Sequence, residues 1–585
     1  MTSVFLQNAC FNHRFIRSRD TSNIVERPER LRAVLLGVTA ALSRLDEEAE
    51  RNSTYKPDEN KDPESDIIAS MNRMILNRDG QGAALTIHRS TASVDLLNHL
   101  AVKFIHGDIE GDTYLENLKL WAAQSRDKVE NGQSEIPDGL SQGDLYLCPE
   151  SIDAIQGALG TVCEAVDHVL GSTEEASTPT ARRAFVAVRP PGHHCGEDTP
   201  SGFCFVNNVA VGAAHAHLKH GIKRVVILDI DLHHGNGTQS IVWQVNEETY
   251  RQSLEAEHGA PIPKPGPQVY YGSIHDILSY PCEDGKADLV QAASTSIHGN
   301  HGQFIENIHF EEYSSDDHFW NDLYKNRYAR LISKAQQFLD QTGGPGDDVL
   351  VFISCGFDAC EHEYESMSRH NRKVPASFYH RFTRDVCEFA QKYARGRLIS
   401  VLEGGYSDRA LTSGTMAHLC GLATQDGIKV QEEWWNVENL TKLEKAAKKR
   451  RGGRSSMPGQ GAAEQWLTRC MDEFWALEGE TPKAPAISAP PAPLSMKLRA
   501  RKSANPSPAS SPSVNKTKAT KTVKREDKEP ALPSSVSAGN MSDESALSSI
   551  IDESDHGTAP AQTVKKLPRV TLRLGPRPDA DVEGA

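Results

Sequence analysis

The sequence predicts an α/β protein of three layers, in which helices cover both faces of a mostly parallel central sheet. Two observations support this fold class. Short apolar runs alternate with helix-like stretches between residues 149 and 402. Most of these runs are continuously apolar, which is typical of strands buried on both faces. Strand–helix alternation over such a length predicts parallel strands with helices packed on either side.

The elements follow in order along the chain. Strands are predicted at 184–188, 224–231, 269–275, 349–355 and 398–402. Helices are predicted at 149–170, 207–219, 318–340 and 376–394. Polar or irregular segments, which we expect to be surface loops, lie at 50–65, 130–143, 246–267 and 283–317. Ligands on a parallel sheet bind beyond the carboxyl ends of its strands, so polar residues there are the candidate site.

The composition changes near residue 480. The chain has 585 residues, and its C-terminal part is rich in Pro, Ala, Ser and Lys with almost no large apolar side chains. Such a segment buries too little surface to order itself, so 480–585 is predicted to be disordered, although 565–578 has some strand character. The remaining chain is divided into a catalytic domain at 1–430 and a helical extension at 431–479.

The charges are unevenly distributed. The formal net charge is −15, and residues 481–585 hold 16 Lys and Arg against 11 Asp and Glu. An acidic body with a basic tail argues against direct nucleic-acid binding by the body. The 11 cysteines form no C-x-x-C pair, and no apolar run approaches the roughly 20 residues that span a bilayer. We expect reduced thiols, an intracellular location and no membrane segment.

Asp231, His233 and Asp358 are candidate metal ligands. Asp231 and His233 are two residues apart at the end of the 224–231 strand, so extended geometry points them to one side. Asp358 follows the 349–355 strand and is placed to supply a third ligand. Two carboxylates and one imidazole leave a position open, as a catalytic zinc requires. Taken alone, D-x-H is more simply explained as a cap of the next helix through Asn236 or Thr238.

His193 and His194 are candidate acid–base groups. They follow the rigid turn Pro190-Pro191-Gly192, and adjacent histidines on a turn can point into one cleft. Asp229 and Asn236 are available to orient them. A carboxylate favours the imidazolium and an amide does not, so the two pKa values should differ. A structural histidine pair is the alternative.

Tyr406 is a candidate for polarising a carbonyl. It follows Gly404-Gly405, which permit a tight turn and a mobile hydroxyl. A phenol aimed at a metal-bound carbonyl would stabilise a tetrahedral oxyanion. An ordinary turn with a packed tyrosine is the alternative.

Five segments, in this order, resemble the zinc-dependent histone deacetylase family of the arginase/deacetylase fold. They are RPPGHH (189–194), SGFCFVNNVAVGA (201–213), LDIDLHHGNGTQ (228–239), SCGFDA (354–359) and LEGGY (402–406). The resemblance covers about residues 5–425. Asn236 in HHGNG is similar to the class II branch, and the tail and inserts resemble a fungal-type member.

This resemblance implies Zn²⁺ on Asp231, His233 and Asp358, and a structural K⁺ at the carbonyls of Asp229, Asp231 and His233. It implies His193 and His194 as the catalytic pair, with His194 as base and acid, and Tyr406 as carbonyl polariser. The residues that match the acyl-lysine tunnel are Gly202, Phe203, Tyr280 and Gly404, and Arg30 matches a basic residue near the acetate exit path.

Two departures from the family pattern concern the tunnel rim. Leu147 stands where many members have an Asp that holds the substrate backbone. Glu365 falls near a rim position that is acidic in acetylpolyamine deacetylases, but Glu363 and Glu365 are more simply read as solvated loop charges. The leading interpretation is a protein lysine deacetylase. The alternatives are an acetylpolyamine deacetylase and a non-catalytic corepressor scaffold.

Partners and location follow from the same interpretation. The expected substrates are acetylated histone tails or other acetyl-lysine proteins, and corepressor subunits and a homo-oligomer are further candidates. The basic segments 445–454 and 524–528 read equally well as nuclear import signals and as solvated charge. The sequence therefore predicts a nuclear protein involved in chromatin regulation and transcription repression, with the cytoplasm as a second location.

Overall fold

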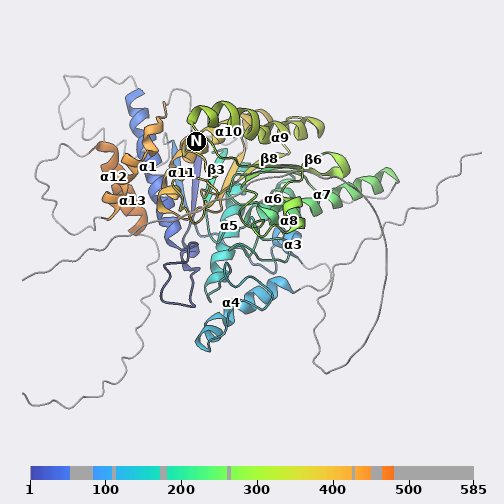
Figure 1. Cartoon of the computed structure of the whole chain (residues 1–585). Coiled ribbons are helices and arrows are strands. Elements are labelled where there is room, and N and C mark those ends of the chain that lie inside the picture. The colour runs from blue at the N-terminus through green and yellow to red at the C-terminus, as the bar shows by residue number, and fades with distance from the viewer. Residues whose placement is uncertain are drawn as a thin grey trace, which may run out of the picture. The chain divides into compact units, whose positions relative to one another are not determined.

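The computed structural model describes residues 2–52, 84–107, 113–171, 181–259, 265–423, 429–448 and 464–479. Its centre is a nine-stranded sheet in the order β2-β1-β3-β9-β8-β4-β5-β7-β6. Every neighbouring pair is parallel except β6 with β7. Helices cover both faces (Figure 1), so the predicted three-layer α/β class is confirmed.

The five strands predicted from apolar runs are all present, within two residues at each end. They are β3 (Arg183–Ala187), β4 (Arg224–Asp229), β5 (Gln268–His275), β8 (Val349–Cys355) and β9 (Leu398–Leu402). All residues of β4, β8 and β9 are buried. Strand β4 lies between β8 and β5, with Asp229 aligned with Ser354 and Ser273. The carboxyl ends of the central strands therefore meet along one edge.

Four strands were not predicted. Strands β1 (Thr2–Gln7) and β2 (Leu85–Ser90) extend the sheet beyond β3, and β7 (Phe304–His309) and β6 (Ile297–His298) extend it beyond β5. The expectation that 283–317 is a surface loop is therefore wrong. Strand β7 has only a few apolar residues, so its composition does not predict a strand. In the structure its backbone pairs with β5.

One face of the sheet carries α5 (Ser151–Leu170) and α6 (Asn208–His220), with α3 (Leu100–His106) and α7 (Asn236–Glu257) packed on α6. The other carries α9 (Arg330–Gln341), α10 (Ser377–Tyr393), α11 (Asp408–Ala423) and α1 (Glu29–Asn52). Helix α6 begins at the Asn207 side chain, which accepts from the Ala210 N–H, and ends at Gly221 with φ 71°.

Two further predictions about loops and helices need correction. The segment 246–267 is not a loop throughout, because α7 continues to Glu257. The helix predicted at 318–340 is divided into a π-helix, η3 (His318–Tyr328), and α9. The remaining short elements are η1 (Asn8–Asn12), α4 (Tyr114–Glu130), α8 (Ala287–Ala292) and η2 (Asn300–Gly302).

The segment 431–479 contains η4 (Glu432–Trp435), α12 (Val437–Lys448) and α13 (Gln465–Gly479). Helix α13 packs on α1, where Thr39 contacts Cys470 and the guanidinium of Arg44 lies 3.7 Å from the Trp466 ring centroid. The division into domains stays a prediction, and the predictions for 480–585, 449–454 and most of 50–65 fall outside the described residues. Among the described helices, none is both long and apolar enough to span a bilayer.

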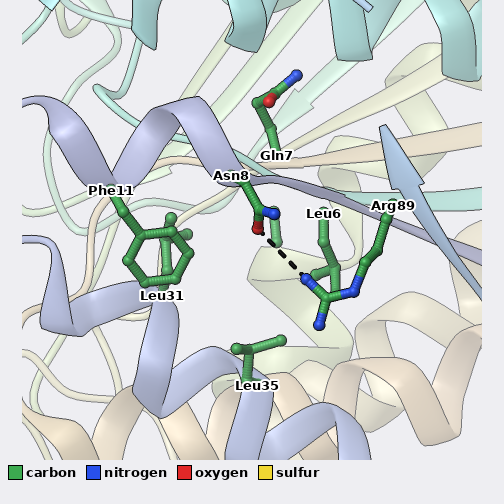
Figure 2. Close-up of a pocket in the computed structure, with 8 residues that line it drawn as sticks. Leu6, Gln7, Asn8, Phe11, Leu31, Leu35 and Arg89 are labelled. Atoms are coloured by element: carbon green, nitrogen blue, oxygen red, sulfur yellow. Dashed lines mark hydrogen bonds between the residues drawn. The ribbon is translucent and has the colours of Figure 1, made fainter. Parts of the chain in front are cut away.

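A small pocket lies where the end of β1 meets α1 (Figure 2). Its volume is about 10 Å³, and Leu6, Phe11, Leu31 and Leu35 surround it. Asn8 accepts a hydrogen bond from Arg89 beside it, at 3.3 Å. The pocket has room for about one water and is too small for a substrate.

Candidate active site

Asp231, His233 and Asp358 lie together at the carboxyl edge of the sheet. Asp231 and His233 follow β4, and Asp358 follows β8, the neighbouring strand. The Nδ1 atom of His233 lies 3.2 Å from Asp231 Oδ1 and 3.0 Å from Asp358 Oδ2. One ligand atom from each residue lies within 4.8 Å of the others, and all three residues are buried. The structure therefore brings the three predicted metal ligands together.

Backbone groups hold these carboxylates in place. Asp231 accepts from the N–H groups of His233 and Gly404, at 3.0 and 2.8 Å, and Asp358 accepts from Leu232 at 2.8 Å. A Cβ atom at Gly404 would lie 2.3 Å from Asp358 Oδ2 and 2.5 Å from Asp231 Oδ2. Gly404 therefore belongs to the carboxylate cradle, because any side chain there would fill it.

The electrostatics of the cluster favour a cation. Burial and the neighbouring Asp231 charge both raise the pKa of Asp358. Burial lowers the pKa of His233, but its contacts with Asp231 and Asp358 outweigh burial and raise the pKa to about 10. A proton on His233 thus occupies the position between two carboxylates where a divalent ion would sit. The donor set fits zinc, with two carboxylate oxygens and one imidazole nitrogen.

His193 pairs with Asp229. Its Nδ1 lies 3.2 Å from Asp229 Oδ2, and the Tyr271 hydroxyl donates to the same oxygen at 3.0 Å. Burial lowers the pKa of His193, but the Asp231 and Asp229 carboxylates outweigh burial and raise it to about 10. This histidine therefore holds its proton at neutral pH.

His194 pairs with Asn236, the first residue of α7. Its Nδ1 donates to the amide oxygen of Asn236 at 2.8 Å, which leaves Nε2 as the basic nitrogen. Burial, and then the charge of His193, hold the pKa of His194 well below its usual value. The centroids of the His193 and His194 rings lie 4.1 Å apart. Because the Asp229 carboxylate favours a protonated imidazole and the Asn236 amide does not, these adjacent histidines differ in protonation.

Glu403 holds the turn that carries this pair. Its Oε2 accepts from the N–H groups of Gly192 at 2.7 Å and His193 at 3.2 Å. Glu403 itself follows β9 and is fully buried, and burial raises its pKa to about 7. The ends of β3 and β9, which are neighbours in the sheet, are thereby joined at the site.

Arg30 and Glu363 fix the loop of Tyr406. The Arg30 guanidinium donates to the carbonyls of Gly405 and Glu403 and lies 5.1 Å from the Tyr406 ring centroid. Glu363 accepts from the N–H groups of Tyr406 at 2.7 Å and Ser407 at 2.8 Å. Glu363 is therefore not a solvated loop charge, which corrects that expectation. Burial raises its pKa to about 7.

A cavity of about 180 Å³ opens above His194 and His233, and Tyr406 lines it. Gly202, Phe203 and Tyr280 also line it, as expected for the tunnel. The left-handed φ of 49° at Gly202 suits glycine, and a Cβ there would lie 2.3 Å from the His194 ring. Phe203 lies 5.9 Å from Tyr406 between ring centroids, and Tyr280 lies 4.8 Å from His194.

Five residues of the cavity were missed from the sequence, namely Asp144, Ser279, Ser366, Met367 and Arg369. Asp144 accepts from the Gly202 N–H at 3.0 Å. Leu147, three residues later, is buried in an apolar cluster, so it does not occupy the rim position that was compared with an Asp.

Asp276 ties the two sides of the rim together. It is buried, and its carboxylate accepts from Ser279 at 2.7 Å and His370 at 2.8 Å, and lies 3.2 Å from the Arg372 guanidinium. Ser279 belongs to the Tyr280 side of the cavity and His370 to the side of Arg369. Glu365 is exposed and is not among the cavity residues.

The fold and this cluster form a candidate metal site at the carboxyl edge of a parallel sheet, and sequence comparison identifies the family. Residues 95–422, more than half of the chain, match the histone deacetylase domain. The chain belongs to the histone deacetylase family.

Several curated proteins are similar to this chain. Histone deacetylase HOS3 of Saccharomyces cerevisiae is 35% identical over 452 residues, which cover 75% of this chain and 58% of the yeast protein. Type-2 histone deacetylase 1 of Dictyostelium discoideum is 28% identical over 48% of this chain and 20% of its own length. The chain thus spans less than two thirds of these relatives. The crystal structure of the HDA15 HD domain aligns with a TM-score of 0.46 and 18% identity, over 82% of this chain and 99% of that one.

Proposed function

We propose that this protein is a zinc-dependent lysine deacetylase that hydrolyses the N6-acetyl-lysine amide of proteins. One observation carries the proposal. The buried Asp231–His233–Asp358 cluster lies at the floor of a cavity that His194 and Tyr406 also line. Bound there, zinc would polarise the acetyl carbonyl and lower the pKa of a water molecule. The relatives named as histone deacetylases support the same chemistry.

The acid–base roles are assigned from protonation. His194 is neutral, with Nε2 free of its Asn236 hydrogen bond, so it takes the proton of the attacking water as general base. The same nitrogen then returns a proton to the lysine amine as the amide bond breaks. His193 donates from Nδ1 to Asp229, which orients its ring beside His194 and favours its protonated form.

Tyr406 donates its hydroxyl hydrogen bond to the acetyl oxygen. Burial and the nearby Asp358 charge hold the pKa of the phenol well above its usual value, so the phenol remains a donor. Arg30 and Glu363 fix the backbone of its loop and so position the ring. Gly202, Phe203 and Tyr280 enclose the uncharged acetylated stem and exclude water from it.

The rim favours a protein substrate over an acetylpolyamine. Glu363 is buried under the Tyr406 loop, and the exposed Glu365 lies outside the cavity. Arg369 and Asp144 both line the cavity, and the Asp144 carboxylate accepts from the Gly202 N–H, so the guanidinium of Arg369 is the charge that would repel a second ammonium group. The close grouping of the metal-ligand candidates, the histidine pair and Tyr406 favours catalysis over a scaffold role.

The test compares an acetylated histone peptide with acetylspermidine, with and without a chelator. We expect turnover of the peptide that exceeds turnover of acetylspermidine, and its loss when metal is removed. Full activity after verified zinc removal would overturn the mechanism. Faster turnover of acetylspermidine would make the protein a polyamine deacetylase.

We further propose acetylated histone tails as substrates, corepressor subunits as partners and the nucleus as the main location, with the cytoplasm as a second one. The acidic body and the histone deacetylase names of the relatives support the choice of a cationic chromatin substrate. The structural K⁺ and a homo-oligomer stay predictions. Fluorescence localisation of the full chain and its deletion of 445–454 test the nuclear assignment.

A further inference from the structure

A second group of metal-binding side chains lies away from the catalytic edge. His99, Cys163 and His215 each offer a ligand atom, and these atoms lie within 4.8 Å of one another. His99 caps the start of α3, Cys163 lies on α5 and His215 lies on α6. Helices α3 and α5 both pack on α6 (Figure 1), so three separate helices converge on the group.

Asp167 makes the surroundings of this group negative. It follows Cys163 by one helical turn, and its Oδ1 accepts from His215 at 2.9 Å and His220 at 2.7 Å. Both α5 and α6 end here, and the unpaired carbonyls of helix C-termini carry partial negative charge. Lys219 Nζ lies 2.8 Å from Asp167 Oδ2 and balances part of this negative charge.

The ligand atoms are in a state that suits an ion. His99 Nδ1 is buried and has no hydrogen-bond partner among the described residues, and the His99 and His215 rings stack at 5.6 Å. Burial lowers the pKa of both histidines, which leaves the imidazoles neutral and able to ligate. The Cys163 thiol is buried beside them and is a soft donor. Burial and the Asp167 charge raise its pKa to about 12, so an ion must displace the thiol proton on binding.

We propose that His99, Cys163 and His215 form a second zinc site, in which the Asp167 carboxylate orients His215 and adds negative charge. Imidazole nitrogen and thiolate sulfur are both zinc ligands, and bond lengths of about 2.0–2.3 Å place ligand atoms within roughly 4 Å of one another. Binding releases the Cys163 proton to solvent as the zinc–sulfur bond forms. Without an ion, the same residues form only a hydrogen-bonded network centred on Asp167.

The site would clamp α3 onto α5 and α6. At the other end of α3, His106 donates to the carbonyl of Glu197 at 2.6 Å and accepts from the Asn207 N–H at 2.9 Å. The segment between those two residues carries Gly202 and Phe203 of the cavity wall. Zinc at this site would therefore stabilise α3 and, through His106, the segment that carries the cavity wall. It would not contact the catalytic cluster.

Cobalt substitution tests the proposal on the full chain. The catalytic cluster contains no cysteine, so a thiolate-to-cobalt charge-transfer band in the near ultraviolet reports the second site alone. We expect this band in the cobalt-loaded chain, and two zinc ions per zinc-loaded chain by elemental analysis. Cys163→Ser should abolish the band and remove one zinc. Cys387→Ser, which alters another buried helical cysteine, should retain both.

Two further variants separate this site from the catalytic one. His99→Gln changes a partly exposed ligand at a helix start, so it tests the site even where Cys163→Ser does not fold. It should weaken the band and lower zinc content, whereas Asp231→Asn should lower zinc content and leave the band. Absence of the band from the cobalt-loaded parent chain, with equal zinc in the parent and His99→Gln, would overturn the proposal and leave the catalytic assignment intact.

Discussion

Two buried clusters of charged side chains lie near Tyr406, and they balance their charges in different ways. The catalytic cluster holds the carboxylates of Asp231 and Asp358 and the imidazole of His233. The other cluster, which we call the Glu26 cluster, holds Glu26 between Arg30 and Arg189, with all three side chains 0% exposed. Both lie beside the backbone of residues 403–406, yet only the first has the donor set of a metal site.

Both carboxylate oxygens of Glu26 accept hydrogen bonds within the Glu26 cluster. Glu26 Oε1 accepts from Arg30 at 2.8 Å and from Arg189 at 2.7 Å, and Oε2 accepts from Arg189 and the Tyr146 hydroxyl, each at 2.6 Å. Burial raises the pKa of Glu26, but the Arg189 guanidinium outweighs burial and holds the pKa far below its usual range. The carboxylate is thus matched by permanent cations.

In the catalytic cluster, two carboxylates face each other, and the nearest cations are imidazoles that can lose their protons. Protonated His233 balances part of their charge, and a divalent cation can take the place of that proton. The contrast indicates that arginine partners make a buried carboxylate structural, whereas titratable partners leave it available to an ion.

Removing a catalytic carboxylate should have the largest effect. Asp358→Asn withdraws one charged ligand, so we expect loss of bound zinc and a fall in deacetylation of about 10³-fold or more, equivalent to about 4 kcal/mol of barrier. Elemental analysis and peptide turnover measure the two effects. Glu365→Gln, at an exposed neighbour, should change neither. Retained zinc and activity in Asp358→Asn would remove Asp358 from the site.

Removing the buried structural carboxylate should reduce stability. Glu26→Gln leaves two buried guanidiniums without a charged partner, and we expect the free energy of unfolding to fall by about 3–5 kcal/mol. Urea titration measures the change. Glu444→Gln breaks the part-exposed Arg409 pair and should cost about 1 kcal/mol or less. Equal costs for the two variants would contradict the comparison.

Tyr406→Phe should separate catalysis from metal binding. Loss of one oxyanion donor is expected to lower kcat by about 10²–10³-fold, or about 3–4 kcal/mol, while zinc content stays unchanged. Tyr393→Phe, which alters a buried tyrosine bonded to Asp340, should leave kcat unchanged. A Tyr406→Phe enzyme with the kcat of the parent would mean that the phenol does not contact the acetyl oxygen.

Between pH 7 and pH 5, acid should weaken the fold through buried neutral histidines, because Glu26 loses its stabilising charge only as pH falls below its ordinary pKa of 4.5. Burial lowers the pKa of His106 to about 4, from 6.5. Its neutral form therefore contributes stability that is fully present above pH 6.5 and is lost as pH falls toward 4, because the unfolded chain takes up the proton first. Between pH 7 and pH 5 the loss is about 2 kcal/mol for this residue.

Urea titrations of the parent and of His106→Gln at these two pH values measure this contribution. The variant starts from a lower stability, and we expect it to lose about 2 kcal/mol less than the parent between pH 7 and pH 5. An identical loss in the two proteins would mean that His106 is not buried as the neutral form.

Much of the site was predictable because the strands are parallel. Asp231 and His233 follow one apolar run, and Asp358 follows another. Since parallel strands end at one edge, contiguous sequence was enough to expect that they meet. Strands β1, β2 and β7 were not predictable in this way, because their place in the sheet depends on neighbours that are distant in sequence.

The α/β class and the central strands could be read from the sequence, and the candidate site residues could be predicted from it, because apolar periodicity and strand-end chemistry are local properties. Only the tertiary structure placed Asp144 rather than Leu147 at the cavity, buried Glu363 beneath Tyr406 and brought His99, Cys163 and His215 together. Each of these depends on packing between segments that share no local pattern. The burial of a carboxylate and its hydrogen-bond partners then decide whether it is a solvated charge, holds a backbone loop in place or can bind a metal ion.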